Sequence, residues 1–161
     1  MTYDTRHQAL QLALEISATP TDPDRWMDFI RSLADVLGGA AIGLTLEIPN
    51  IAASRLVYRH NLDPAYNEVT ARVIARGQSP WSMDGLTQGF VRTTASDPAT
   101  AVEDTAYYRE VLIPQGVAAE LPIGHVFAHR EGRDLAAIII YRMEAGRPFD
   151  ASDLELLDLL V

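Results

Sequence analysis

Cysteine is missing from this 161-residue chain. Its absence excludes disulfide bonds, thiolate nucleophiles and cysteine-rich zinc sites. Basic residues are also scarce, because 13 Lys and Arg stand against 22 Asp and Glu, a formal net charge of −9. Nucleic acids and anionic lipids attract proteins through Lys and Arg, so a surface of this sign repels them. We therefore expect no binding to DNA, RNA or a membrane by this segment itself.

Long apolar runs are absent as well. The most apolar stretch, residues 135–141, is far shorter than the roughly 20 residues that a helix needs to cross a bilayer. The N-terminal segment has neither the basic start nor the long apolar centre of a signal peptide. The sequence therefore predicts a cytoplasmic protein, and its length fits one domain over residues 1–161.

Apolar periodicity predicts the order of helices and strands. The strands arrive as hairpins and do not alternate with helices, which is typical of a mainly antiparallel sheet. We expect an α+β fold with helices on one face of the sheet and loops plus short helices over the other. The expected helices are 6–18, 25–37, 65–75, 106–112 and a last one starting at 150 or 152, and the expected strands are 40–48, 54–60, 117–129 and 135–143.

Residues with special backbone preferences mark the ends of these elements. Gly38-Gly39 and Gly77 are expected to end helices, whereas Asp63-Pro64, Asp104 or Thr105, and Asp150 or Ser152 are suited to begin them.

The middle of the chain, residues 78–102, is predicted to be irregular, and aromatic residues gather around it. A loop of this length in a compact domain is usually functional or loosely ordered. Aromatic rings and a few hydroxyls beneath it are suited to line a ligand cavity. Ordinary core packing stays open as an equal alternative, since aromatic residues also dominate cores. The candidate ligand-binding residues are Tyr58, His60, Tyr66, Trp81, Phe90, Arg92, Tyr107 and Tyr108.

Signals for catalysis or metal binding are weak. No serine stands in a Gly-x-Ser-x-Gly context, and the phosphate-binding glycine motifs are missing. His125 and His129 lie four residues apart on an expected strand, and Glu120 is the nearest acid that could join them. Two histidines and a distant acid are a poor ligand set, so pocket-lining or solvent-facing roles fit them better. We expect no catalytic residue, no metal and no cofactor.

The two terminal helices carry apolar stripes wider than docking on one sheet face requires. This width favours a homodimer interface, and docking on the chain's own domain is the alternative. The last helix stays apolar up to Val161 with no residue that ends it, which predicts that more chain follows. The candidate interface residues are Leu10, Leu14, Leu154, Leu156, Leu157 and Leu160.

Four short motifs follow one another along the chain. They are Trp26-x-x-Phe29 with Leu33 and Leu37-Gly38-Gly39, Ser79-Pro80-Trp81, 107–112 with Pro114-x-Gly116, and Arg142 with Pro148-Phe149-Asp150-x-x-Asp153. Their order resembles that of the GAF-like sensor domains that precede a LuxR-type helix-turn-helix, with Ser79 where those domains usually have Asn. The resemblance covers nearly the whole chain. It implies a GAF/PAS-like fold, a dimeric transcriptional regulator and DNA binding through a C-terminal part absent from this chain.

The resemblance leaves the ligand unidentified. Acyl-homoserine-lactone sensors of the wider group use a Trp, a Tyr and an Asp-Pro pair followed by a second Trp. This chain has Tyr58, Asp63-Pro64 and Trp81 but no first Trp at a fitting distance, so a lactone is not expected. The leading hypothesis is a domain that senses an unknown small molecule and dimerises. A ligand-free dimerisation scaffold is the alternative, and a small hydrolase or metal-dependent enzyme is a remote one.

Overall fold

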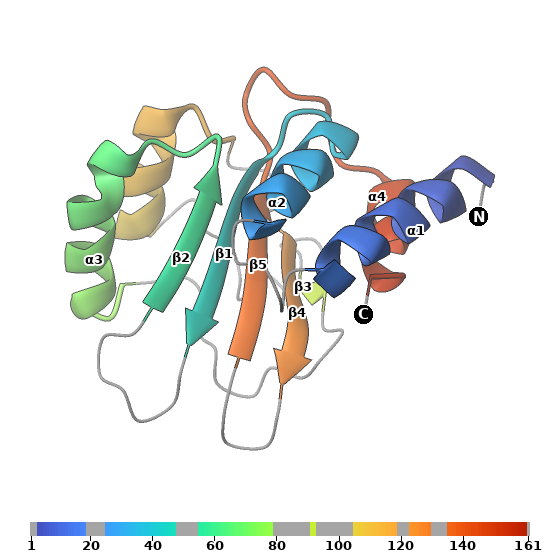
Figure 1. Cartoon of the computed structure of the whole chain (residues 1–161). Helices are drawn as coiled ribbons and strands as arrows, with labels where there is room; N and C mark the ends of the chain where they lie inside the picture. The colour runs from blue at the N-terminus through green and yellow to red at the C-terminus, as the bar shows by residue number, and fades with distance from the viewer. Residues whose placement is uncertain are drawn as a thin grey trace.

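Five strands form one antiparallel sheet in the order β2-β1-β5-β4-β3 (Figure 1). The computed structural model describes residues 3–18, 25–47, 55–78, 91–92, 105–118, 123–129 and 135–160. The α+β class and the antiparallel sheet expected from the sequence are confirmed. The strands are β1 (Ala41–Glu47), β2 (Arg55–His60), β3 (Val91–Arg92), β4 (Ile123–His129) and β5 (Leu135–Tyr141).

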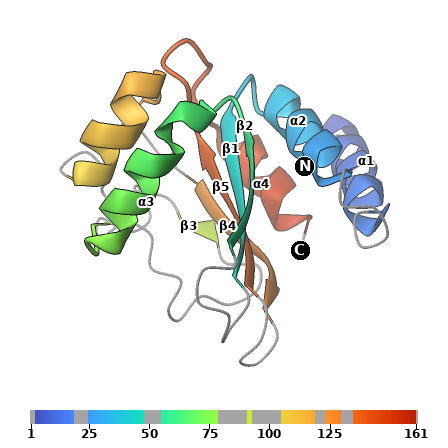
Figure 2. The same cartoon turned by 60° about the vertical axis from the view of Figure 1, so that its left-hand side comes forward.

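Helices cover both faces of this sheet (Figure 2). We call the side with α1 (Tyr3–Ala18), α2 (Arg25–Val36) and α4 (Ala151–Asp158) the first face. On the second face lie α3 (Asn67–Ala75), which follows a 3-10 turn at Pro64–Tyr66, and a helical segment of Tyr108–Leu112 and Ile113–Gln115. Within the described ranges, no helix is long and apolar enough to cross a membrane.

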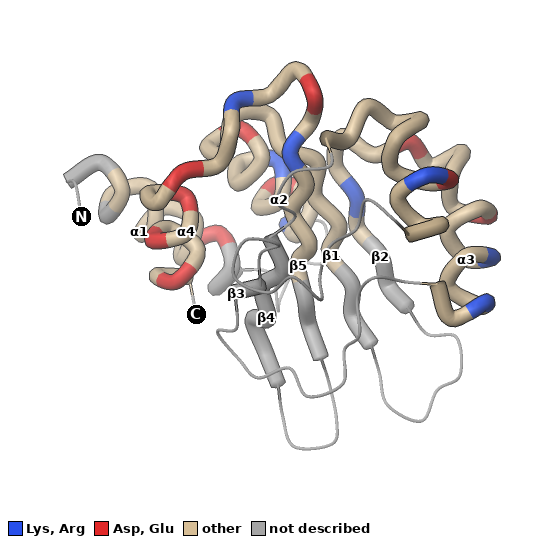
Figure 3. The backbone as a smooth tube through the Cα atoms, turned by 180° about the vertical axis from the view of Figure 1, so that it is seen from behind, with Lys and Arg blue, Asp and Glu red and all other residues tan. Residues whose placement is uncertain are grey.

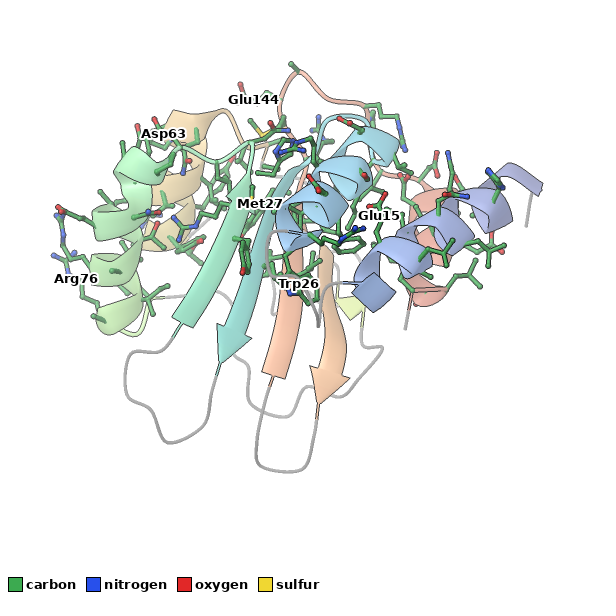
Figure 4. The ribbon with its side chains drawn as sticks, in the orientation of Figure 1. Glu15, Trp26, Met27, Asp63, Arg76 and Glu144 are labelled. Carbon is green, nitrogen blue, oxygen red and sulfur yellow. The ribbon has the colours of Figure 1, made fainter. Side chains whose placement is uncertain are left out.

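The first face holds the larger core. Phe29, Ile30 and Leu33 on α2 are completely buried and meet the strand residues Ile42 and Ile138. Burial of such side chains stabilises a fold by about 1.5–3 kcal/mol each. Trp26 and Met27 pack against this core from the same helix, on its side toward the sheet (Figure 4). The Trp26 ring meets that of Phe29 edge-on, with centroids 6.1 Å apart.

The second face has a smaller core of mixed composition. Ala41 and Tyr141 from the sheet, Val73 from α3, and Val111 and Leu112 from the Tyr108–Leu112 segment are buried together. Tyr107 and Tyr108 pack against them. This layer therefore brings the phenol groups of Tyr107 and Tyr108 close to the buried Tyr141 of the sheet.

The predicted ends of several elements are confirmed. The Asp63 carboxylate accepts from the Ala65 amide at 2.8 Å, and the Thr105 hydroxyl accepts from the Tyr108 amide at 3.1 Å. Asp150 begins α4 with a reciprocal capping box that includes Asp153. Side-chain oxygens at these positions satisfy amides that have no partner within their own helix.

Two expected elements differ from the structure. The segment expected as an α-helix at 106–112 widens into a π-helical turn over Tyr108–Leu112. Pro114 follows it and has no amide hydrogen to continue a regular helix. Of the strand expected over 117–129, β4 begins at Ile123 and Val117 forms an isolated bridge with Met143, while residues 119–122 lie outside the described residues.

Arg147 ties the end of α2 to the start of α4. Its guanidinium donates to both carboxylate oxygens of Asp153, at 2.7 and 2.5 Å, and to the Val36 carbonyl at 3.4 Å. These bonds hold the pKa of Arg147 above its usual value. Gly38 has φ +75°, and a Cβ there would lie 2.8 Å from the Arg147 Cγ. The turn after α2 therefore needs glycine both for its backbone and for this contact.

Candidate ligand-binding face

One row of residues crosses all five strands on the second face. Strand pairing sets Gly43 opposite Arg59 and Ile139, and it sets Gly124 opposite Ile139 and Arg92. Directly paired residues of antiparallel strands share a face, and Ile139 packs in the second-face core. The row therefore has arginine positions on the two edge strands and glycines at two of the three places between them.

Gly43 leaves a bare patch of main chain in the middle of this row. No atom in the described part of the chain lies within 4 Å of where a Cβ would stand at Gly43. Ala41, two residues away on the same face, contributes only a methyl group. Glycine in the interior of a strand is typical of a place where another group approaches the backbone closely.

Two tyrosines form the polar side of the patch. Tyr141 is only 3% exposed, and its hydroxyl is hydrogen-bonded to that of Tyr107. Burial raises the pKa of Tyr107, while the Tyr141 hydrogen bond and the positive charge of Arg59 act in the opposite direction. Tyr107 therefore stays neutral at physiological pH and keeps a proton that it can donate.

Polar contacts join the two helical pieces that cover the second face. The Gln115 side chain accepts from the Asp63 amide at 2.7 Å and donates to the Val111 carbonyl at 2.5 Å. Asn61, with φ 56°, donates to the Ala40 carbonyl at 3.0 Å. Asp63 thus acts as a helix cap and loop anchor. These contacts therefore join the two helical pieces to each other near Asp63 (Figure 4), and they join Asn61 to the residue that precedes β1.

The structure divides the predicted ligand-binding residues between the two faces. Tyr107 and Tyr108 lie on the second face, as part of the layer around Tyr141. Tyr58 instead packs against the first-face core, and His60, two residues along β2, shares its side. Since strand residues alternate between faces, Tyr58 and His60 do not line one cavity with Tyr107, which corrects that expectation.

The remaining predicted ligand-binding residues are placed only in part. Tyr66 lies partly buried at the end of the 3-10 turn that leads into α3. Arg92 occupies the β3 end of the row through Gly43, by strand register. Trp81 and Phe90 lie outside the described residues. Their part in ligand binding stays a prediction.

The predicted interface leucines also separate into two sets. Leu10 and Leu14 on α1 are 64% and 63% exposed. Leu156, Leu157 and Leu160 are buried in the first-face core at 2%, 0% and 8% exposure, and Leu154 packs against it partly buried. The second set is covered by the domain itself, which corrects the expectation that α4 turns these leucines toward another subunit.

A register shift lies between the two histidines of β4. His125 pairs with Ile138 and His129 with Leu135, because the pairing is irregular between Val126 and Ala128. The regular alternation that would give both histidines one face is therefore interrupted, and Glu120 lies outside the described residues. Among the residues that the structure describes, no group of three or more His, Asp or Glu is arranged to hold a metal ion.

Sequence reasoning missed Arg59, Gly43 and Tyr141. Alternation along 54–60 does separate Arg59 from Tyr58 and His60, and that signal was available. Which residue of β1 pairs with Arg59 depends on the register of the hairpin, and the sequence alone does not determine that register. Tyr141 was inside the strand expected over 135–143, so nothing in the sequence distinguished its hydroxyl from an ordinary core group.

Comparison with known proteins gives one structural relationship. No family model matches the sequence, and no curated protein sequence matches it. The fold is similar to that in a crystal structure of Escherichia coli SdiA, with a TM-score of 0.57 at 14% identity. The similarity covers 84% of this chain and 56% of the SdiA chain. The chain therefore has the fold of a little more than half of SdiA.

Proposed function

We propose that this chain is the small-molecule-sensing and dimerising domain of a LuxR-type transcriptional regulator, with the ligand bound at the bare patch over Gly43. SdiA is a LuxR-type regulator, and the fold shared with it supports the family that the sequence motifs resemble. The GAF-like relationship, the action in the cytoplasm and the binding of DNA through a part outside residues 1–161 belong to the same proposal.

The observation that supports ligand binding is the bare patch over Gly43, which lies beside the buried phenol groups of Tyr107 and Tyr141. A binding site needs apolar walls with a few fixed polar groups. Ile139 and the adjoining apolar layer supply the apolar walls, and the Tyr107–Tyr141 pair supplies the fixed polar groups.

Signal transmission follows from the position of Gly43 within β1. Its chain neighbours Ile42 and Leu44 point to the other face and are completely buried against the α1, α2 and α4 core. A ligand that moves the main chain at Gly43 therefore also moves side chains on which the terminal helices rest. Any such shift is limited by the difference in the ligand's affinity for the two arrangements.

A thermal-shift screen with and without Gly43→Val tests the ligand site. A ligand at about 100 times its Kd stabilises a protein by about 2.7 kcal/mol, or roughly 5–10 °C at this size. We expect compounds that raise the Tm of the natural chain and leave Gly43→Val unaffected, because valine fills the patch. The variant without compound should melt at a similar temperature. Equal stabilisation of both proteins, or no stabilising compound, would contradict the site.

The exposed leucines of α1 support dimerisation. They would support it equally if the chain were a dimerisation scaffold that binds no ligand. Leu10 and Leu14 lie one turn apart, so they form one apolar stripe of the kind that marks an interaction surface. Light scattering on the Leu10→Asp, Leu14→Asp double variant should give half the mass of the natural chain. Gln11→Asp, exposed on the same helix, is the control. Equal masses for all three proteins would remove α1 as the interface.

A further inference from the structure

A positive charge stands beside the bare patch, on the β2 side. Arg59 lies directly across from Gly43 in the strand pairing and is partly buried. Its charge is close enough to act on the Tyr107 hydroxyl. One end of the patch is therefore cationic, and its opposite flank is the aliphatic side chain of Ile139.

Arg59 has no acidic partner within the described residues. Other arginines do have acidic partners, for example Arg31 with Asp28, and Arg147 with Asp150 and Asp153. A guanidinium withdrawn from water is normally matched by an anion. Among the described residues of this face, no acidic side chain supplies that anion to Arg59.

The two faces of the sheet differ in the charge of their helices. Acidic residues follow one another on α4, at Asp153, Glu155 and Asp158, with no base in that helix (Figure 3). α3, on the second face, carries both Glu68 and Arg72 and is followed by Arg76, so this helix is not acidic overall. The formal net charge of −9 repels anions in general, so an anionic ligand needs a local cation such as Arg59.

The groups around the patch also limit the shape of the ligand. A glycine floor admits a flat group against the main chain, and Ile139 gives it an apolar contact. The guanidinium is a planar fork of donors that matches the two oxygens of a carboxylate. Neutral Tyr107 adds one further donor near the same place.

We propose that the sensed ligand is a planar carboxylic acid, whose carboxylate is held by Arg59 and whose flat apolar part lies over Gly43. This inference rests on the proposed sensing function and specifies the chemistry of its ligand. Arg59 acts as the specificity-determining residue, because it separates acids from neutral compounds of the same shape.

Benzoate and benzamide are matched probes of this inference, since they share the ring and differ in charge. Amide NMR signals of Gly43 and Ile139 in the labelled 161-residue chain report binding at the patch. We expect both signals to move with benzoate, at a dissociation constant about tenfold or more below that for benzamide, as is usual for a charged hydrogen-bonded pair.

Three variants identify the residue responsible. Arg59→Gln should reduce the preference for benzoate to less than about twofold, and Arg59→Lys should restore part of it by charge without the planar fork. Arg76→Gln, exposed at the end of α3 (Figure 4), should keep the full preference. Unchanged far-ultraviolet circular dichroism would establish that each variant is folded.

The outcomes separate this inference from the proposed function. Signals that move equally with benzamide and benzoate, or a preference that survives Arg59→Gln, would overturn the carboxylate while keeping the site. If neither probe moves the Gly43 signal and the compound screen also gives no Gly43-dependent stabilisation, both the ligand class and the sensing function are wrong.

Discussion

The two faces of the sheet use the same strands for different purposes. On the first face, Ile42, Leu44, Ile138 and Ile140 present aliphatic side chains that are all completely buried under three helices. On the second face, the alternate residues of the same two strands include Gly43, Ile139 and Tyr141, and a charged residue stands at the β2 edge. Alternation along β1 and β5 therefore separates a layer that stabilises the fold from a layer with bare backbone, hydroxyls and charge. The separation predicts that stability and ligand binding respond to different substitutions.

The largest expected effect is loss of the first-face core. Phe29→Ala should lower the free energy of unfolding by about 3–5 kcal/mol, because it removes a completely buried ring and leaves a cavity. Val73→Ala, at a completely buried position of the second-face core, should cost about 1.5 kcal/mol for its two missing carbons. Urea unfolding followed by circular dichroism gives both values. Equal losses would contradict the unequal weight of the two faces.

A smaller loss is expected when the contact between α2 and α4 is cut. Arg147→Ala leaves the Asp153 carboxylate, 4% exposed, without its two guanidinium donors, which should cost about 1–3 kcal/mol. The matched control is Arg31→Ala, whose pair with Asp28 is exposed at 54% and 68% and should contribute less than about 1 kcal/mol. Chemical denaturation compares them, and similar losses would mean that the contact with α4 adds nothing beyond a surface pair.

Two glycine substitutions compare the tightly packed side with the bare one. Gly38→Ala should destabilise the fold by about 1–2 kcal/mol, because φ is +75°, and the contact with Arg147 adds strain. Gly43→Ala should leave stability unchanged or raise it by about 0.5 kcal/mol, because Gly43 is a strand position with room for a methyl group. The Tm of each variant is the measurement. A clear drop for Gly43→Ala would mean that the patch is filled.

A modest effect at neutral pH is expected from Tyr107→Phe, about 1 kcal/mol for the lost hydrogen bond to Tyr141. The loss of the buried phenol should be most visible in the stability at alkaline pH. The pKa of Tyr107 is raised in the folded state, so the stability linked to its proton is complete below the unfolded value of about 10. It is lost as the pH rises through the folded value. Unfolding midpoints measured across that range should fall less steeply for Tyr107→Phe, and parallel slopes would refute the buried phenol.

Local sequence signals predicted most of the fold. Asp63, Thr105 and Asp150 cap the helices that follow them, because a cap depends only on residues two or three positions away. The same kind of reasoning failed at 106–112, where Pro114 and the tertiary packing of Val111 and Leu112 widen a turn that periodicity describes as an ordinary helix. It also failed at β4, whose bulge has no marker in the sequence.

The candidate site was harder to predict because it is a product of strand pairing. Of the predicted ligand-binding residues, Tyr107 and Tyr108 lie on the second face, whereas Tyr58 and His60 were chosen for their type and lie on the other face. Residues 59, 43 and 139 become neighbours only through a register between segments up to 96 positions apart. In the same way, the stripe of α4 gave no sign of whether its own domain or a second subunit would cover it.

The position of β1 between β2 and β5 determines the order in which the sheet can assemble during synthesis. β1 and β2 are adjacent in the chain, but the partner on the other edge of β1 starts at Leu135. A ribosome therefore releases α1, α2 and the first hairpin well before β5 exists. Until then Ile42 and Leu44 lack their neighbours on β5. Contacts between segments that are distant in the sequence also form slowly. The segment from Leu135 onward therefore completes the sheet around β1, and truncation before it should leave the earlier segments exposed to aggregation.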